Sequence, residues 1–341
     1  MQLKDNLLWL MYRSGAVSVF RNASTRLDGL VKRTGLIPLP ERGAMIVMLH
    51  QITEDSTPFR RGLDVDVFDA FCAYIAKHYD VLPLEELERR RRSGRVPSRG
   101  IALTFDDGHA DNYHLALPIL RRYHLPATVF VTTGFINNDY VPWSTRLALI
   151  LEHAQPPDGP IDLDGLTLDL SSIDRRLAAQ AQLGEHFQNL EKARTDALID
   201  ELGERLNVAV EEACKREICT WEQLTEMNNA GFRPGAHTVS HPFLTRIPVE
   251  DARREMAQSK EEIEGRLKTK VESFAYPNGK ERDYNDAVRD AARQVGFSLA
   301  VTALHGVNDA TRDPFDLRRV GIYGQLPNAI ARIERWFYAT A

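Results

Sequence analysis

The sequence IALTFDDG occupies residues 101–108. Its first five residues, Ile101–Phe105, form a continuous apolar run, which is typical of a strand buried on both faces in a parallel sheet. Asp106, Asp107 and Gly108 follow directly, where such a strand would end. Parallel α/β folds place their functional sites at the carboxyl ends of their strands. This stretch therefore predicts both a fold class and the position of its chemistry.

Similar short apolar runs recur on both sides of this stretch, and helical patterns separate several of them. The runs cover residues 44–49, 127–132, 232–236, 271–275, 297–301 and 319–322. The alternation predicts a parallel sheet with helices outside it, either doubly wound or closed into a barrel. No G-x-G-x-x-G follows the first strand, so the sequence does not support a dinucleotide site.

The segment 138–219 interrupts this alternation because it contains no long buried-strand run. Residues 161–170 alternate apolar and polar side chains around Asp164-Gly165, which predicts a hairpin. Leucines recur at helical spacing over 174–206. We therefore expect an inserted subdomain made of a hairpin and helices.

The overall composition is that of an ordinary globular protein. The 341 residues include 43 basic and 48 acidic side chains, with 43% hydrophobic and 27% charged residues. These values exclude a disordered chain, a collagen and a membrane bundle. A net charge of −5 provides no general electrostatic footprint for nucleic acid, so no nucleic-acid partner is expected. Three cysteines (Cys72, Cys214 and Cys219) cannot form a disulfide framework, and their odd number indicates a reducing compartment.

The first 20 residues contain no clear targeting signal. The apolar stretch Leu7–Met11 is too short for a signal peptide or for a transmembrane helix, which needs about 20 apolar residues. Leu3, Leu7 and Leu10 fall at helical spacing, with basic residues nearby. Two interpretations remain open: a helix packed on the body of the protein, or an interfacial helix on the cytoplasmic leaflet.

Imidazoles and tight turns follow other predicted strands, and they should meet Asp106 and Asp107 at the same rim. His50 follows the run 44–49, His237 and His241 follow 232–236, and residues 276–279 (YPNG) follow 271–275. Two histidines and a carboxylate suit a divalent metal such as zinc, with coordination positions left for water. Pro242 disfavours a helical conformation for the residue before it, so a loop should present both rings.

The adjacent carboxylates are expected to have different roles. If the strand geometry continues, the side chains of Asp106 and Asp107 point in opposite directions. One carboxylate would then hold the metal and the other would act as a base.

Three motifs together resemble the NodB-like polysaccharide deacetylases. Residues 104–108 (TFDDG), followed by Asp111-Asn112, look like the first motif of that family. Residues 237–242 (HTVSHP) resemble its second motif, and residues 274–279 (FAYPNG) resemble the F-A-Y-P-x-G form of its third. The resemblance covers roughly residues 44–137 and 220–325. It implies a distorted (β/α) barrel of about seven strands and a metal-dependent removal of N-acetyl groups from glycans.

The resemblance also assigns roles to individual residues. It implies that Asp107, His237 and His241 bind a divalent metal ion, with zinc expected first and cobalt, nickel, iron or manganese as alternatives. It implies that Asp106 is the general base for a metal-activated water that attacks the amide carbonyl, and that the backbone N–H of Asn278 stabilises the oxyanion.

Two departures from the family pattern affect the remaining catalytic assignments. Many members carry an arginine in the third motif that orients the base, but Ala275 stands there. We expect Arg319 to take this role from the last strand; the alternative is a structural salt bridge. The late L-x-x-H motif is not in its usual form, and we expect His305 to be the general acid.

Further rim residues are expected to contact substrate, namely His50, Tyr276, Pro277 and Trp143. For His50 and His305 the alternative is a hydrogen-bonded structural histidine. For Trp143 the alternative is packing within the insertion. His109, His114 and His124 follow the first motif and are expected to be structural or exposed.

These assignments divide the chain into four parts. We expect an N-terminal helical segment (1–43), a catalytic barrel (44–137 and 220–330), a mostly helical insertion that lines the substrate groove (138–219) and a C-terminal tail (331–341). The expected function is the N-deacetylation of a glycan or glycan precursor in bacterial surface polysaccharide biosynthesis. The alternatives are a deformylase or O-deacetylase acting on a lipid-linked sugar, and a catalytically silent glycan-binding module. We expect a cytoplasmic location, with peripheral contact to the inner membrane through residues 1–20 as an additional hypothesis.

Overall fold

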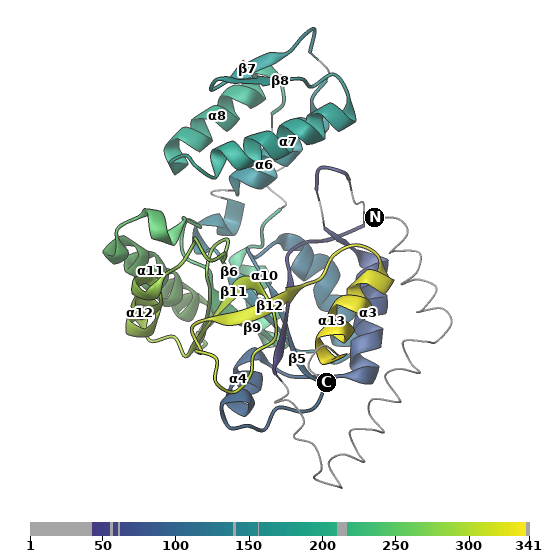
Figure 1. The fold of residues 1–341 in the computed structure, drawn as a ribbon, viewed down its shortest axis with the longest axis vertical. Helices are drawn as coiled ribbons and strands as arrows, with labels where there is room; N and C mark the ends of the chain where they lie inside the picture. Colours follow the sequence, from purple (N-terminus) through teal and green to yellow (C-terminus); the bar gives the residue numbers. More distant parts are fainter. Residues whose placement is uncertain are drawn as a thin grey trace.

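Seven parallel strands close into a barrel in the computed structural model (Figure 1). Around the barrel the strands follow the order β1, β12, β11, β10, β9, β6 and β5. Pairing of Met45 with Ile101 through Leu49 with Phe105 closes the ring between β1 and β5. This confirms the predicted (β/α) barrel and decides against the doubly wound alternative. The structure describes residues 43–54, 57–60, 62–138, 141–155, 157–209 and 217–338, so the predicted N-terminal helix lies outside the described residues.

The barrel strands begin and end close to the predicted apolar runs. They are β1 (Met45–Leu49), β5 (Gly100–Phe105), β6 (Ala127–Val131), β9 (Phe232–Ala236), β10 (Ser273–Ala275), β11 (Leu299–His305) and β12 (Leu317–Gly321). β5 and β6 are buried along their whole length, as continuous apolar runs predict. The short β4 (Asp80–Val81) pairs with the start of β5, and β2 (Ile52–Thr53) pairs with β3 (Leu63–Asp64). β11 extends four residues beyond the predicted run and therefore includes His305.

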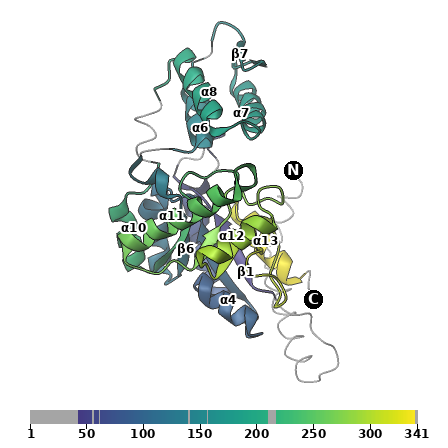
Figure 2. The ribbon, with the colours of Figure 1, turned by 90° about the vertical axis from the view of Figure 1, so that its left-hand side faces the viewer.

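Helices cover the outside of the barrel (Figures 1 and 2). They are α3 (Val65–His78), α4 (Leu84–Arg92), α5 (Leu117–Arg122), α10 (Trp221–Asn229), α11 (Val249–Leu267), α12 (Asp286–Val295) and α13 (Leu326–Tyr338). The prediction of a C-terminal tail from residue 331 is wrong, because α13 continues to Tyr338. Ile333 is fully buried, and Glu334 accepts hydrogen bonds from the hydroxyls of Tyr74 and Tyr79 on and beside α3. These contacts hold α13 against α3.

The insertion forms a separate layer at one end of the barrel, drawn at the top of Figure 1. It contains α6 (Trp143–His153), the hairpin β7 (Ile161–Leu163) and β8 (Leu166–Leu168), α7 (Ile173–Phe187) and α8 (Lys192–Arg205). Asp164 and Gly165 both have positive φ, as the predicted two-residue turn requires. The subdomain has its own hydrophobic cluster, to which Ile150, Leu183, Phe187 and Ile199 contribute. The hairpin is therefore confirmed, while the limits of the insertion at 138 and 219 stay a prediction.

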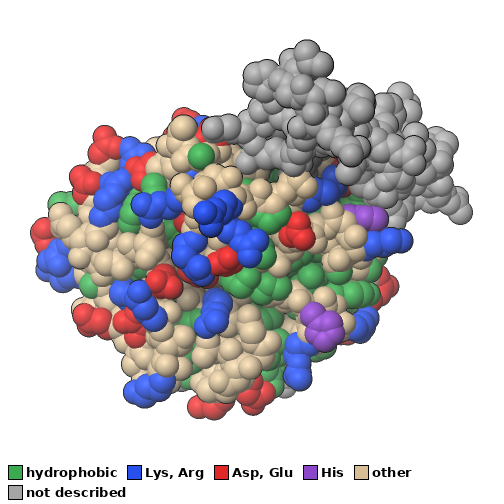
Figure 3. All heavy atoms as spheres, turned by 90° about the horizontal axis from the view of Figure 1, so that it is seen from below, with side chains coloured by type: hydrophobic (Ala, Val, Ile, Leu, Met, Phe, Trp, Pro, Cys, Tyr) green, Lys and Arg blue, Asp and Glu red, His purple; other side chains and the backbone are tan. Residues whose placement is uncertain are grey.

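The face seen from below in Figure 3 carries basic side chains interspersed with acidic ones. On α4, Glu86 pairs with Arg89 and Arg90 along the helix surface. Arg91 on the same helix is buried instead and donates to the carboxylate of Glu88 at 2.5 and 2.7 Å. Ion pairs within the helix therefore offset the charges of these three arginines. Within the described residues, no helix combines the length and the apolar character that a membrane crossing requires.

Candidate active site

The end of β5 places the two adjacent carboxylates at the rim of the barrel. Asp106 is 3% exposed, and its backbone N–H donates to the carbonyl of Leu49 on β1. Asp107 has φ +74° and Gly108 has φ +79°, so the chain turns sharply at this point. A non-glycine residue in this region is costly, and such strain is concentrated at functional sites. The two carboxylates have different neighbours, but this turn separates them, and not the continued strand geometry on which the prediction rested.

Asp107, His237 and His241 form the candidate metal site. One carboxylate oxygen of Asp107, Oδ1, lies 3.5 Å from His237 Nε2 and 3.6 Å from His241 Nε2. The three residues can each offer one ligand atom, all within 4.8 Å of one another. Both histidines lie in the loop after β9, so the loop predicted from Pro242 is confirmed.

Hydrogen bonds to the backbone orient this ligand set. His237 Nδ1 lies 2.7 Å from the carbonyl oxygen of Ala275, so Nδ1 carries the hydrogen and the Nε2 lone pair faces the site. Thr238 and His241 both have positive φ, and Thr238 Oγ1 accepts from the backbone N–H of His241. Glu255 on α11 accepts from the N–H groups of residues 239 and 240 at 2.8 and 2.9 Å. Sequence reasoning missed Glu255, because it occurs on a long charged helix with no local motif.

Arg319 holds Asp106 with two parallel hydrogen bonds. Arg319 Nη1 and Nη2 lie 2.6 and 2.7 Å from the two carboxylate oxygens, and Arg319 is only 1% exposed. Its Nε donates to the carbonyl of Thr302 at 2.7 Å. Burial alone would raise the pKa of Asp106, but the charge and hydrogen bonds of Arg319 hold that pKa below its ordinary value. The structure thus brings together the pair that the sequence suggested, and Asp106 stays ionised.

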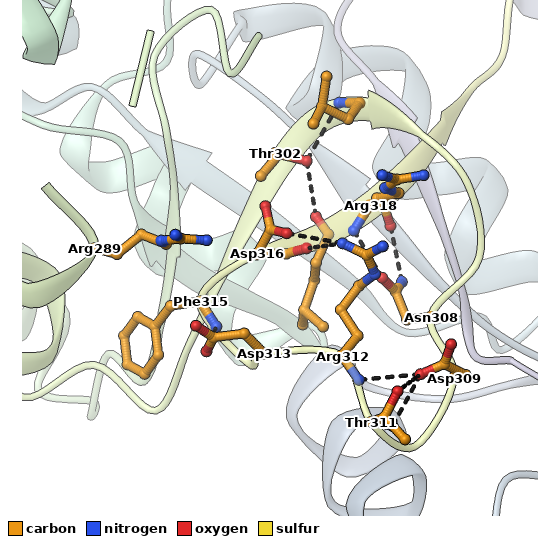
Figure 4. A network of polar contacts seen from close by, with 12 residues as sticks. Arg289, Thr302, Asn308, Asp309, Thr311, Arg312, Asp313, Phe315, Asp316 and Arg318 are labelled. Carbon is orange, nitrogen blue, oxygen red and sulfur yellow. Dashed lines mark hydrogen bonds and ion pairs between the residues drawn. The ribbon is translucent and has the colours of Figure 1, made fainter. Parts of the chain in front are cut away.

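Figure 4 shows the connection between β11 and β12, where Thr302 and Asn308 hold the backbone next to Arg319 in sequence. Asn308 is fully buried; its Oδ1 accepts from the N–H of Arg318 at 2.7 Å, and its Nδ2 donates to the Arg318 carbonyl at 2.9 Å. Thr302 Oγ1 donates to the carbonyl of Leu317 at 3.1 Å. These contacts fix the two residues that precede Arg319, and nothing in the sequence pointed to Asn308.

The third motif forms a tight turn beside the metal ligands. Asn278 and Gly279 both have φ +60°, and the N–H of Gly279 donates to the carbonyl of Pro277 at 2.7 Å. A Cβ at Gly279 would lie 2.6 Å from the backbone nitrogen of Ala303, so this close approach requires glycine. Among the described residues, no group accepts a hydrogen bond from the backbone N–H of Asn278. That N–H is therefore free to bind an oxyanion, as the resemblance implies.

The surroundings of Tyr276 and Pro277 argue against the predicted substrate contacts. Tyr276 is 1% exposed, its hydroxyl donates to the carbonyl of Phe315 at 2.9 Å, and its ring stacks on Tyr284 at 4.7 Å. Pro277 is also buried. The Tyr276 side chain packs against Tyr284 and Phe315, which favours a structural role over a sugar contact.

The other predicted rim residues have different surroundings. His50 Nε2 lies 3.8 Å from the nearer oxygen of Asp106, and the side chain is 48% exposed. His305 is exposed at the end of β11, opposite Arg319 in the strand pairing, and no contact joins it to the metal ligands within the described residues. Its role as general acid stays a prediction. Trp143 packs edge-to-face on Phe187 at 5.8 Å against the core of the insertion, which favours the packing alternative over sugar stacking.

His109 is the residue that sequence reasoning most clearly undervalued. It is 4% exposed, and its Nε2 lies 3.4 Å from Asp107 Oδ2, the carboxylate oxygen turned away from the other two histidines. Burial alone would lower the pKa of His109, but Asp107 raises it to about 9. Burial would raise the pKa of Asp107, yet its contacts with His109, His237 and His241 hold that pKa well below its ordinary value.

Two clefts share Gln51 and Arg60 as lining residues. The first, of about 340 Å³, is also lined by Asp111 and Glu217. The second, of about 380 Å³, is bounded on one side by Phe59 and on the other by residues of α6 and α7 (Ser144, Thr145, Ala148, Leu177, Gln180 and Ala181). The insertion therefore forms one wall of the second cleft.

Comparison with known proteins identifies a family and supports the fold. Residues 93–300 match the polysaccharide deacetylase family. The chain is 21% identical to YxkH of Bacillus subtilis, whose name assigns it to the polysaccharide deacetylases, over 72% of this chain and 59% of YxkH. A stretch of 57 residues is 37% identical to the poly-beta-1,6-N-acetyl-D-glucosamine N-deacetylase of Staphylococcus epidermidis, covering 17% of this chain and 20% of that enzyme. The match thus spans less than two thirds of the length of either relative.

Two solved structures have the same fold. One is the Streptococcus pyogenes deacetylase PplD in complex with acetate, with a TM-score of 0.58 and 22% identity over 86% of this chain and 98% of that chain. The other is IcaB from Ammonifex degensii, with a TM-score of 0.56 and 18% identity over 87% of this chain and 97% of that chain. At these identities the likeness shows the fold alone, and the chemistry must be argued from the residues themselves.

Proposed function

The chain belongs to the polysaccharide deacetylase family, and on that premise we propose that it is a metal-dependent hydrolase that removes N-acetyl groups from a glycan or glycan precursor. The family match covers more than half of the chain. The single observation that carries the proposal is the position of the buried Asp106–Arg319 pair next to the Asp107, His237 and His241 cluster. A base held ionised beside a set of metal ligands is the arrangement that amide hydrolysis requires.

The donor atoms of the cluster suit a divalent transition metal. Two imidazole nitrogens and one carboxylate oxygen are typical of catalytic zinc sites, so we propose zinc, with cobalt, nickel, iron and manganese as alternatives. The tautomer of His237 supports this assignment, because its Nε2 lone pair faces the position between the three candidate ligand atoms. When bound there, the metal supplies Lewis acidity, which polarises a carbonyl oxygen and lowers the pKa of water.

The remaining steps are performed by residues of the chain. Asp106 takes a proton from the attacking water, and Arg319 keeps its carboxylate ionised and oriented for that transfer. The free N–H of Asn278 donates to the oxyanion that forms when water adds to the acetamide carbonyl. The carbon–nitrogen bond then breaks, the nitrogen takes up a proton, and acetate and a free amino sugar leave. We assign the donation of that proton to His305, with Asp106 returning its own proton as the alternative.

The neighbouring clefts support a polymeric or extended substrate. The second cleft is bounded by Phe59 and by residues of α6 and α7, so a sugar chain in the site would meet the insertion. We therefore propose that the insertion lines the substrate groove, and that His50 contacts the substrate at the rim. The similarity to a poly-beta-1,6-N-acetyl-D-glucosamine N-deacetylase supports an N-acetylated glycan over an N-formyl or O-acetyl sugar. It also supports a role in surface polysaccharide biosynthesis.

We propose a cytoplasmic location, with peripheral membrane contact through residues 1–20. The buried free thiols of Cys72 and Cys219 support a reducing environment. Fractionation of cells expressing the full chain would test this proposal, since recovery from the medium or the cell wall would contradict it.

A substrate panel tests the proposed function. Purified protein is incubated with N-acetylated, N-formylated and O-acetylated oligosaccharides, and released acetate and formate are measured together with bound metal. Asp106→Asn should lower turnover by about 10²–10⁴-fold while retaining the metal. Asp290→Asn makes the same chemical change at an exposed position on α12 and should leave both properties unchanged. Release of formate alone would favour a deformylase, and glycan binding without metal or turnover would favour a silent binding module.

A further inference from the structure

The segment that follows Gly108 is fixed by the returning end of the insertion. The N–H of Cys219 donates to the carbonyl of Gly108 at 3.0 Å, and the N–H of Ala110 donates to the carbonyl of Glu217 at 2.9 Å. His109 and Ile218 form an isolated antiparallel bridge between these two contacts. The backbone of His109 is thus held on both sides, two residues after the carboxylate of Asp107.

The two oxygens of Asp107 face different partners. Oδ1 faces the Nε2 atoms of His237 and His241, whereas Oδ2 faces the Nε2 atom of His109 at 3.4 Å. An ionised carboxylate can only accept hydrogen bonds, so His109 Nε2 carries the hydrogen. His109 therefore occupies the oxygen that the metal cluster does not use.

We propose that His109 is a positioning residue for the metal ligand Asp107. By donating to Oδ2 it stops the carboxylate from rotating and leaves Oδ1 alone to bind the ion. Removing a residue that hydrogen-bonds to a metal ligand in this way typically weakens metal affinity by about 10–100-fold. This inference rests on the proposed metal-dependent function, and it concerns a residue outside the predicted ligand set.

A second set of contacts holds the ring of His109 from its other side. Gln51 Nε2 lies 3.4 Å from His109 Nδ1 and 3.3 Å from Glu217 Oε2. Arg60 contacts Glu217 at 3.4 Å, and its Nε donates to Glu152 on α6 at 2.8 Å. A continuous polar chain therefore runs from the metal ligand to the first helix of the insertion. The ring cannot turn away from Asp107 without losing its contact with Gln51.

Metal affinity distinguishes positioning from simple core packing. His109→Phe keeps a ring of similar volume but removes the donor, and His109→Gln restores an N–H at about the same reach. His153→Phe, at an exposed position on α6, is the matched control. The dissociation constant for Zn²⁺ is measured for each full-length protein by competition with a chromophoric chelator, and the unfolding midpoint is measured without metal.

The expected result is a Zn²⁺ dissociation constant about 10–100-fold weaker in His109→Phe. We expect recovery to within a few-fold of wild type in His109→Gln, and no change in His153→Phe. Gln51→Met serves as a second variant if His109→Phe does not fold, and it should weaken the affinity in the same direction. Wild-type affinity in His109→Phe, or an equal loss of affinity in His109→Phe and His109→Gln, would overturn the role of His109 and leave the proposed function intact. A wild-type protein that binds no divalent metal would overturn the proposed function as well.

Discussion

Replacing Arg319 with methionine should show how much the ion pair between Arg319 and Asp106 contributes to the stability of the protein. Arg319 and Asp106 are 1% and 3% exposed and share two hydrogen bonds of 2.6 and 2.7 Å. Methionine approximates the length of the arginine stem but removes the charge and the donors to Asp106 and Thr302. The substitution therefore leaves a buried carboxylate without its partner.

The expected loss of stability follows from that burial. Removing one partner of a buried ion pair costs about 3–5 kcal/mol, a large fraction of the roughly 5–15 kcal/mol that stabilises a typical domain. Arg253→Met is the matched control, because Arg253 forms a surface pair with Glu250 and is 43% exposed. Exposed pairs contribute about 0–1 kcal/mol, so the control should unfold almost as wild type does.

The dependence of this loss on pH has a definite sign. In the wild type, Arg319 holds the folded-state pKa of Asp106 below its unfolded value, so the stabilisation is present above the unfolded pKa of about 3.9 and is lost as pH falls. Without Arg319, burial dominates and the folded-state pKa of Asp106 rises above the unfolded value. The defect of Arg319→Met should therefore be largest near neutral pH and should shrink as pH falls. The acid limb of kcat/KM should move to higher pH for the same reason.

Urea denaturation at several pH values, with kcat/KM measured across the same range, provides the assay. The double variant Asp106→Asn/Arg319→Met should be less destabilised than the sum of its single variants, because it leaves no unpaired buried charge. An Arg319→Met protein that unfolds within about 1 kcal/mol of wild type at neutral pH, with an unshifted acid limb, would refute the argument.

Three further changes test separate parts of the site. A Zn²⁺ concentration of about 100 times the dissociation constant should raise the unfolding free energy of the wild type by about 2.7 kcal/mol. His237→Ala should not show this increase. An equal increase in both proteins would argue against His237 as a metal ligand. Tyr276→Phe should lower the free energy of unfolding by about 0.5–1.5 kcal/mol, because the hydrogen bond to Phe315 is lost, and KM should be unchanged. A raised KM would support the predicted contact between Tyr276 and the sugar. Gly279→Ala should lower kcat more than it changes KM, because the added Cβ would collide with the backbone of Ala303 and displace the N–H of Asn278. A wild-type kcat in this variant would contradict the role of that N–H in binding the oxyanion.

The part of the site that sequence could predict is the part encoded locally. Asp106 and Asp107 follow an apolar run, and the two histidines of the candidate metal site follow another, so strand ends alone place them on one rim. The rejection of a helix for these histidines also depended on one neighbour, Pro242. These predictions held because continuous apolar runs and backbone sterics act over a few residues.

The supporting residues could not be read in the same way because their partners are distant in sequence. Arg319 and Asp106 are separated by 213 positions, and a known arginine role in similar proteins was needed to propose their contact. Glu255 and Asn308 have no such precedent in a motif, and each acts through backbone N–H groups that any sequence would offer. Tyr276 was misjudged for a related reason: its motif lies at the site, but its side chain points into the layer outside β10.

Backbone strain links these local and distant contributions. Asp107, Thr238, His241 and Asn278 all have positive φ, and all four lie in turns that form the candidate site. Each such conformation costs of order 1–3 kcal/mol in a non-glycine residue and persists only where surrounding contacts over-determine it. The contacts of His109, Glu255 and Gly279 provide that constraint from three different elements. The motif residues therefore supply the reactive groups, while His109 and Glu255 outside the motifs, together with Gly279 in the third motif, fix the strained turns that direct those groups toward one point.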